Sequence, residues 1–99
     1  MQLSHSSRKY EKEIDNSILM YREKLLIAGE VDPIVFLLLI KISSIRSEKV
    51  INSLYDYFVA GESRNIACDR HGVSQGFLSL KIKALQDLSH QIKKISRYF

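Results

Sequence analysis

The stretch SRNIACDRHGVSQGFLSLKIKAL, at residues 63–85, is the part of the sequence that decides the fold. Its first serine can cap a short helix, and Ser74 can cap a second, longer one. Only a brief turn containing Gly72 and Val73 separates the two helical patterns. Two helices joined in this way predict a helix-turn-helix, which we place at about residues 63–88.

Five residues of this stretch have the types that a sharp turn between helices requires. Helices that cross steeply need a small side chain where their backbones approach, which Cys68 supplies, and a turn residue that tolerates positive φ, which Gly72 supplies. Val73 and Leu78 are expected to fill the angle between the helices, and Ile82 to continue the apolar face of the second. We interpret Cys68 as a packing residue and not a nucleophile, because no Cys-His-Asp arrangement can be argued around it.

Apolar residues recur at spacings of three and four outside this stretch as well, so we expect an all-α fold: a small helical domain of about five helices with a long C-terminal helix. Asp32 before Pro33 predicts a helix through Ile42, because the carboxylate accepts orphan N–H groups and proline lacks one. The other expected helices cover residues 14–28, ended by Gly29; residues 48–60, capped by Ser47 and ended by Gly61; Ser63 to about His71; and the residues from Ser74 toward the C-terminus.

Two apolar patterns indicate where the core lies. Residues 34–42 are apolar nearly all round, so we expect this helix to be the buried central element. The alternative is that this segment is a partner surface, and together with the long C-terminal stripe it motivates the prediction of a dimer. Along the last helix one stripe faces a core or a partner helix; its members are Leu78, Ile82, Leu85, Leu88, Ile92 and Ile95. We expect residues 1–12 to form a flexible polar arm and residues 13–99 a single helical domain.

Positive charge is concentrated in the C-terminal third. The 99 residues include 15 Lys and Arg against 11 Asp and Glu, a formal net charge of +4, and Asp87 is the only acidic residue of segment 70–99. Such a balance favours an anionic partner, most often nucleic acid or an acidic membrane. The longest apolar run, at residues 34–40, is far below the roughly 20 residues that span a bilayer. We therefore expect a cytoplasmic protein without a membrane partner.

The residue inventory does not favour catalysis or metal binding. His5, His71 and His90 share no ligand spacing and are most simply surface or partly buried residues. Acidic pairs such as Glu11 and Glu13 lie in a polar stretch, which gives acid-base catalysis no support. The sequence contains no phosphate-binding glycine loop and no nucleophile elbow. We expect no enzyme, no metal, no cofactor and no small-molecule substrate.

The first turns of the last helix are the candidate surface for double-stranded DNA. If this helix enters a groove, Gln75, Phe77, Ser79 and Lys81 face the bases, and Gly76 allows close approach of the backbone. Gln75 is suited to adenine, and Lys81 to guanine or phosphate. Phosphate contacts are assigned to the helix N-terminus capped by Ser74, to Arg64 and to Lys83. Two alternatives stay open: Phe77 belongs either to the core or to the contact surface, and Lys93, Lys94 and Arg97 are either contacts or a solvated face.

A likeness to a known family rests on two segments and three later residues. The segments are FLLLIKISSIRSEKVI at residues 36–51 and YDYFVAGESR at 55–64, and the residues are Cys68 and the pair Gly76-Phe77. On these residues the chain resembles the PapB-type family of adhesin (fimbrial) operon transcription regulators of enteric bacteria. The resemblance implies a small all-helical DNA-binding protein that activates or represses fimbrial genes and binds AT-rich repeats as a cooperative oligomer.

The resemblance covers roughly residues 34–88, and it implies that Arg64 and Cys68 belong to the first element of the family's helix-turn-helix and Gly76-Phe77 to the start of the second. It also implies orientation toward the minor groove, whereas an ordinary recognition helix docks in the major groove; both stay open. We interpret the chain as a bacterial, nucleoid-associated DNA-binding regulator that forms a homodimer or higher homo-oligomer. The alternative is a helical protein-interaction module that holds a partner by the stripe at 78–95 without direct DNA binding.

Overall fold

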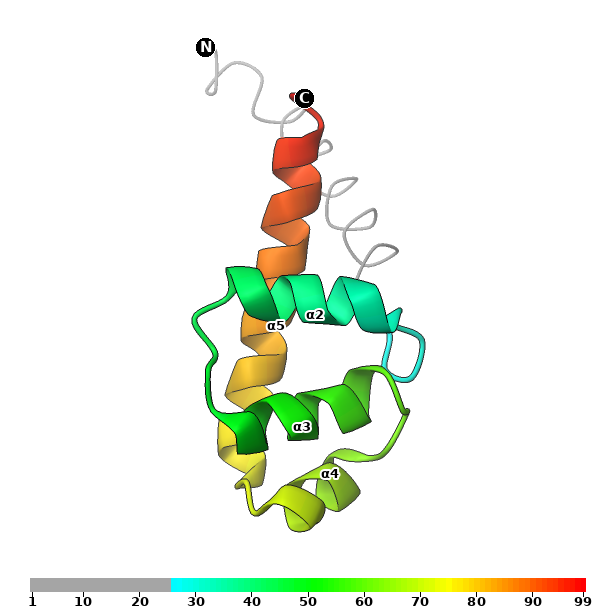
Figure 1. Ribbon diagram of the computed structural model, residues 1–99, viewed down its shortest axis with the longest axis vertical. Helices are drawn as coiled ribbons and strands as arrows, with labels where there is room; N and C mark the ends of the chain where they lie inside the picture. Colours follow the sequence, from blue (N-terminus) through cyan, green and yellow to red (C-terminus); the bar gives the residue numbers. More distant parts are fainter. Residues whose placement is uncertain (1–25) are drawn as a thin grey trace, which may run out of the picture.

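The computed structural model describes residues 26–99, and this part of the chain consists of four α-helices without a β-strand (Figure 1). The helices are α2 (Pro33–Ile42), α3 (Glu48–Phe58), α4 (Arg64–His71) and α5 (Gln75–Ser96). The all-α class is confirmed, and each helix lies where the sequence predicts one, although α3 ends at Phe58 and not at residue 60.

The predicted helix over residues 14–28 lies largely outside the described residues. Its last part, Leu26 to Ala28, is described and is not helical, so the prediction extends too far at this end. Gly29 lies in a turn with a φ of +80°. The segment from Leu26 to Asp32 is therefore a connection that leads into α2.

All four helices begin at the residues that the sequence marks as caps. Asp32 Oδ1 accepts a hydrogen bond of 2.7 Å from the backbone N–H of Ile34, and Pro33 follows as the first helical residue. The hydroxyl groups of Ser47, Ser63 and Ser74 accept from the N–H groups three residues further along α3, α4 and α5. Since these bonds satisfy donors that have no partner inside the helix, they fix each helix start locally.

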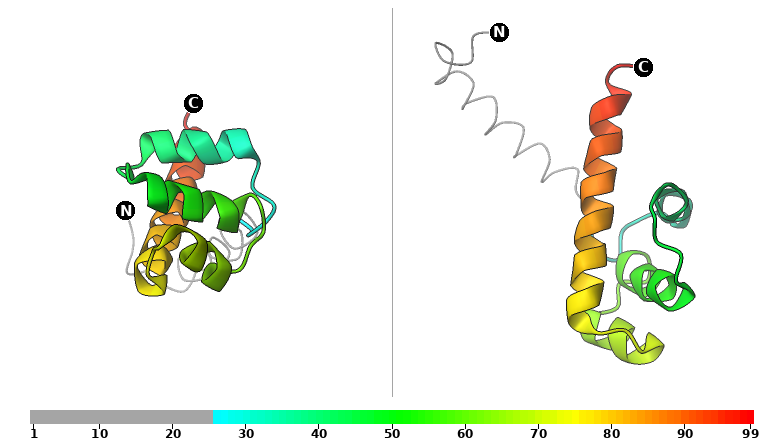
Figure 2. Two further views of the ribbon diagram at one scale, coloured as in Figure 1. Left: turned by 60° about the horizontal axis from the view of Figure 1, so that its bottom comes forward. Right: turned by 90° about the vertical axis from the view of Figure 1, so that its left-hand side faces the viewer.

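The helices α2, α3 and α4 lie one after another along one side of α5 (Figures 1 and 2). α5 has 22 residues and is about 33 Å long at 1.5 Å per residue. Its N-terminal half contacts the other helices, and its C-terminal end extends past α2, as the right-hand view of Figure 2 shows. The corner between α4 and α5 and the outward side of α2 thus lie at opposite ends of the helix stack.

The core is centred on α3 and the N-terminal half of α5. Leu54 and Phe58 from α3 and Leu78 and Leu85 from α5 are completely buried. Phe36 of α2, only 1 % exposed, covers this group from the other side. α3 is therefore the central element, with α2 and α4 on either side of it.

The prediction that residues 34–42 form the buried central element is wrong. Only Phe36, Leu39 and Ile40 of α2 are buried. Its other side carries large exposed aliphatic side chains: Ile34, Val35, Leu37, Leu38 and Ile42. Because α2 packs against α3 and α5 with one side only, a helix that is apolar all round gives no sequence signal for the side that faces inward.

The stripe of the last helix is confirmed in its first half. Leu78 and Leu85 are fully buried, and three further members are partly buried against the core: Ile82, Leu88 and Ile92. Ile95 is 54 % exposed, because α5 has by then passed beyond the other helices.

Two connections tie the ends of these helices together. The N–H of Gly29 donates to the carbonyl of Phe58 at 2.9 Å, and the N–H of Val31 donates to the same carbonyl at 3.1 Å. The amide of Gln86 holds the backbone of Leu26 at two points, accepting at 2.9 Å and donating at 2.8 Å. The connection before α2 is thereby fixed to the end of α3 and to the middle of α5.

Candidate nucleic-acid interface

The corner between α4 and α5 is built by a three-residue turn. α4 ends at Gly72, which has a left-handed φ of +70° and whose N–H donates to the carbonyl of Cys68. The N–H of Val73 donates to the same carbonyl at 3.0 Å. Ser74 then caps α5 through the N–H of Phe77 at 3.2 Å. Glycine suits this position, because few other residues adopt this φ without strain.

The inner side of this corner is well packed. Cys68 is only 3 % exposed and lies beside Ala67, which is completely buried. Leu78 fills the space from the side of α5, and Val73 and Ile82 pack against the same core. Of the residues that the sequence proposes for the turn, Cys68 and Leu78 are buried and Val73 and Ile82 are partly buried against the core.

The thiol of Cys68 is held in its neutral form. Burial raises the pKa of the thiol, the neighbouring Asp69 carboxylate raises that pKa further, and the Arg64 guanidinium lowers it. A thiol with a raised pKa is a poor nucleophile near neutral pH, since the thiolate is the reactive form.

The outer side of the corner presents the first turn of α5 to solvent. Ser74, Gln75 and Gly76 are exposed, and Phe77 is 44 % exposed. Phe77 therefore belongs to the surface and not to the core, which decides the alternative that the sequence leaves open. No atom lies within 4 Å of a Cβ built on Gly76, so the backbone at this position is open to another molecule.

Arg64 and Ser79 are joined across the corner. Arg64 Nη1, in the first turn of α4, donates to Ser79 Oγ in α5 at 2.9 Å. A guanidinium has five N–H donors, and this bond uses one of them. The two residues, which the sequence proposes as separate contacts, thus form one unit that holds a cation beside the first turns of α5.

Phe77 and Lys81 form a second unit on the opposite flank of α5. Lys81 Nζ lies 5.1 Å from the centroid of the Phe77 ring, within the range of a cation–π interaction. With 3.6 residues per turn, Gln75 and Ser79 fall on one flank of the helix and Phe77 and Lys81 on the other. The predicted contacts therefore line both edges of the exposed face.

Lys83 is less well placed than the other candidates. Its Nζ forms an ion pair with Asp87 Oδ2 at 3.0 Å, one turn further along α5. Asp87 offsets part of the positive charge of Lys83, and both side chains are largely exposed to solvent. Among the predicted contacts, Lys83 contributes least to an anion-binding surface.

A cluster of charged side chains that the sequence analysis missed ties α4 to α3. Asp56 Oδ2 accepts from His71 Nε2 at 2.8 Å and from Arg70 Nη1 at 3.1 Å. Arg70 also lies 3.5 Å from Glu62. The basic count of the C-terminal third includes Arg70, but two carboxylates neutralise it here. No spacing rule indicates this cluster, because Asp56 and His71 are fifteen positions apart.

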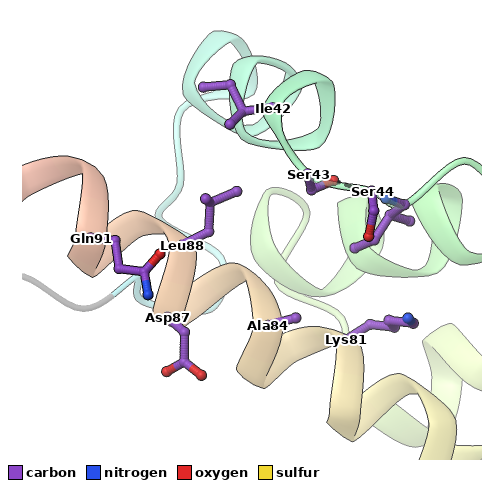
Figure 3. Close-up of a pocket in the computed structure, with 9 residues that line it drawn as sticks. Ile42, Ser43, Ser44, Lys81, Ala84, Asp87, Leu88 and Gln91 are labelled. Atoms are coloured by element: carbon purple, nitrogen blue, oxygen red, sulfur yellow. Dashed lines mark hydrogen bonds between the residues drawn. The ribbon is translucent and has the colours of Figure 1, made fainter.

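A groove of about 320 Å³ lies beside α5, on the flank that carries Lys81 (Figure 3). Ile42 and Ser44, from the joint between α2 and α3, face Ala84 and Leu88 of α5 across it. Arg46 stabilises this joint by donating to the carbonyls of Ser43 and Ile45 at 2.8 and 2.7 Å. The groove is open to solvent and mainly apolar.

Between Leu26 and Phe99, no group of three or more His, Cys, Asp or Glu side chains is placed to hold a metal ion. In the same part of the chain, no helix is both long and apolar enough to cross a membrane. Among the described residues, the candidate binding surface is therefore the exposed corner between α4 and α5, with its two cationic units and its open backbone.

A small all-helical domain with this exposed corner is typical of transcription regulators, and comparison with known proteins agrees with this class. The model of the PapB family, described as adhesin biosynthesis transcription regulatory protein, matches residues 7–99. The chain belongs to this family of adhesin biosynthesis transcription regulatory proteins, which is a family of regulators and not of enzymes.

Similar proteins come from Escherichia coli. Regulatory protein FanB is 52 % identical over 83 residues, which cover 84 % of each chain. The F1845 adhesin operon regulatory protein is 43 % identical over 73 % of this chain and 85 % of its own length. The crystal structure of FocB has a TM-score of 0.71 at 34 % identity and covers 86 % of this chain and 97 % of that chain. The resemblance to the PapB-type family stated from the sequence is therefore confirmed.

Proposed function

We propose that this protein is a DNA-binding regulator of adhesin genes in the bacterial cytoplasm, where it associates with the nucleoid. α4, the turn at Gly72 and α5 form a helix-turn-helix whose exposed first turn of α5 enters a groove of AT-rich double-stranded DNA. Copies of the chain bind their regulatory region as a cooperative oligomer. The observation that carries this proposal is the Arg64–Ser79 unit, in which the bond of 2.9 Å holds a cation of α4 against the second turn of α5.

The residues of the corner divide into two roles in this proposal. Arg64 and the helix N-terminus at Ser74 contact phosphates and supply affinity. Gln75 and Ser79 on one flank, and Phe77 with Lys81 on the other, face the base edges and supply sequence preference. The exposure of Arg64, Ser74, Gln75 and Phe77 supports the division, and Ser79 and Lys81 are half-buried beside them.

A helix-turn-helix also explains why the packing of the corner is so complete. The angle between α4 and α5 is fixed by the packing of Cys68, Val73 and Leu78, so α5 keeps one orientation relative to α4. A protein-interaction module that captures a partner through the stripe at 78–95 is not supported. Leu85, at the centre of that stripe, is already completely buried in the core of the protein.

Arg64→Ala tests the proposal directly. We measure the dissociation constant by fluorescence anisotropy on an AT-rich duplex taken from upstream of an adhesin operon, and on an unrelated duplex, at several salt concentrations. Arg64→Ala is expected to weaken binding on both duplexes and to reduce the slope of log affinity against log salt by about one.

Two control variants separate the charge of Arg64 from its position. Ser79→Ala removes the bond at 2.9 Å but keeps the cation, so its salt slope should equal that of the wild type. Arg97→Ala removes an exposed arginine at the far end of α5 and should leave binding unchanged. A nearly flat salt dependence of the wild-type protein would contradict DNA binding through phosphates.

A further inference from the structure

The outward side of α2 carries five of the exposed large apolar side chains between residues 26 and 99, and the proposed function does not use them. Its five aliphatic side chains, which we call the outer face of α2, are between 45 % and 67 % exposed: Ile34, Val35, Leu37, Leu38 and Ile42. Ile34, Leu37, Leu38 and Ile42 are at positions i, i+3, i+4 and i+8, which lie on one face of an α-helix, and Val35 borders this face because it lies three residues before Leu38. Monomeric proteins rarely expose a large contiguous apolar patch without using it for binding.

We propose that the outer face of α2 binds the same face of a second copy of this chain, with the two helices antiparallel about a two-fold axis at Leu38. In this register Leu38 contacts its own counterpart, and Ile34 lies opposite Ile42 of the second copy. The proposal deepens the proposed function, because it names the surface through which the regulator associates with itself.

The charges at the two ends of α2 favour this orientation. Glu30 and Asp32 are exposed next to the N-terminus of the helix, and Lys41 is exposed in its last turn. Antiparallel packing brings Lys41 of each copy near the acidic end of the other. A parallel arrangement would place like charges beside each other, so the antiparallel pair is preferred.

A second copy of the chain also adds contact area. A contact between two identical faces doubles the area contributed by one helix, and a specific interface needs roughly 1,000 Å² in total. The groove lined by Ile42, Ala84 and Leu88 continues the face at its C-terminal end and adds apolar surface there (Figure 3).

Association through α2 leaves the proposed DNA surface free. α3 lies between α2 and α4, and the corner of α4 and α5 is at the other end of the helix stack (Figure 1). Each copy of the dimer therefore keeps its own exposed corner with Arg64 and Gln75.

A charge-exchange experiment at Leu38 tests the proposal. The full chain is studied without DNA by sedimentation velocity, as the wild type, as Leu38→Glu, as Leu38→Lys and as an equal mixture of the two variants. We expect the wild type to be dimeric at high micromolar concentration and each variant alone to be monomeric, because like charges meet at the axis. The mixture should regain the dimer, because opposite charges then face each other.

Matched variants show that the effect belongs to this face. Ile66→Glu on α4 and Ile95→Glu on α5 place the same charge at other exposed isoleucines, which are 46 % and 54 % exposed. Both should remain dimeric. Circular dichroism of all variants should show an unchanged helix content, since Leu38 is itself 54 % exposed.

Several results would overturn the proposal. The first is a wild-type protein that is monomeric. The second is a Leu38→Glu variant that remains dimeric. The third is a dimer that Ile95→Glu dissociates while Leu38→Glu does not. A mixture that stays monomeric would also overturn it, and a monomeric wild type would leave the face to residues 1–25 of the same chain or to another protein. Since no DNA is present, failure here leaves the Arg64→Ala test of DNA binding unaffected.

Discussion

Gly29 and Gly61 meet backbone to backbone at the end of α3. A Cβ atom on Gly29 would lie 3.0 Å from the Cα of Gly61, and both glycines have a left-handed φ, of +80° and +79°. This close approach lets the N–H of Gly29 reach the carbonyl of Phe58, which has no partner inside α3. The contact therefore closes the end of the central helix and fixes the connection that leads into α2.

Gly29→Ala is expected to destabilise the protein by about 1 to 3 kcal/mol, because the added Cβ meets backbone atoms and the residue must keep a strained φ. The free energy of unfolding in urea measures the effect. Gly76→Ala is the matched control, since a Cβ on Gly76 has nothing within 4 Å and lies in a helix. This control should be neutral or stabilising; equal destabilisation by both variants would argue against the close approach.

Cys68→Leu is expected to destabilise the protein by about 1 to 3 kcal/mol, because the larger side chain overpacks the contact between α4 and its neighbours. The melting temperature measures this effect. A melting temperature equal to that of the wild type would mean that the helices approach each other elsewhere.

The raised pKa of the Cys68 thiol predicts a loss of stability at alkaline pH. The folded protein holds the thiol neutral, while the unfolded chain ionises it at a lower pH. The stabilisation is complete below the thiol's ordinary pKa of about 8.5 and is lost as the pH rises from there through the raised value. Unfolding free energies of the wild type and Cys68→Ala, measured between neutral and alkaline pH, should converge as the pH rises. A constant difference between them would contradict this prediction.

Asp56→Asn is expected to destabilise the protein by about 1 to 2 kcal/mol, because a half-buried part of the link between α3 and α4 loses its charge. Asp56 accepts from both His71 and Arg70, and its side chain is only 16 % exposed. Urea unfolding measures the change. Glu62→Gln, which removes only the longer contact to Arg70, should change stability by less than about 0.5 kcal/mol.

Gln75→Ala should relax the preference among DNA sites while it leaves general affinity nearly unchanged. Loss of a contact to a base edge reduces discrimination at that position by about 1 to 3 kcal/mol. Lys81→Ala should also alter the preference, and in addition it frees the Phe77 ring that Lys81 covers. Competition binding with duplexes that differ at single base pairs measures both effects. A uniform loss of affinity on every duplex would instead assign these residues to phosphate contacts.

Local features of the fold were predictable because their causes are local. Asp32, Ser47, Ser63 and Ser74 cap helices through bonds to atoms three residues away or fewer, and Gly72 ends α4 by its own φ. The sequence could therefore place every helix start in the described part of the chain. The same holds for the proposed contacts at the start of α5, whose exposure follows from the position of the turn.

Features that depend on distant parts of the chain could not be read in this way. Three sets of contacts join residues that are 14 to 60 positions apart in the sequence. They are the bond between Arg64 and Ser79, the bonds of Asp56 to Arg70 and His71, and the hydrogen bonds between Gln86 and Leu26. No periodicity or motif reports which side chains meet at such separations.

By itself, the sequence determined the helix starts in the described part of the chain, the turn at Gly72, the family and the region that carries the candidate contacts, because these depend on short-range hydrogen bonds and on residue type. The tertiary structure alone decided that α3 and not α2 is central, and that Ile34, Leu38 and Ile42 face outward. The physical reason is that burial depends on which neighbours cover a helix. α2 is apolar on every side, so only its packing against α3 and α5 selects the side that water does not reach.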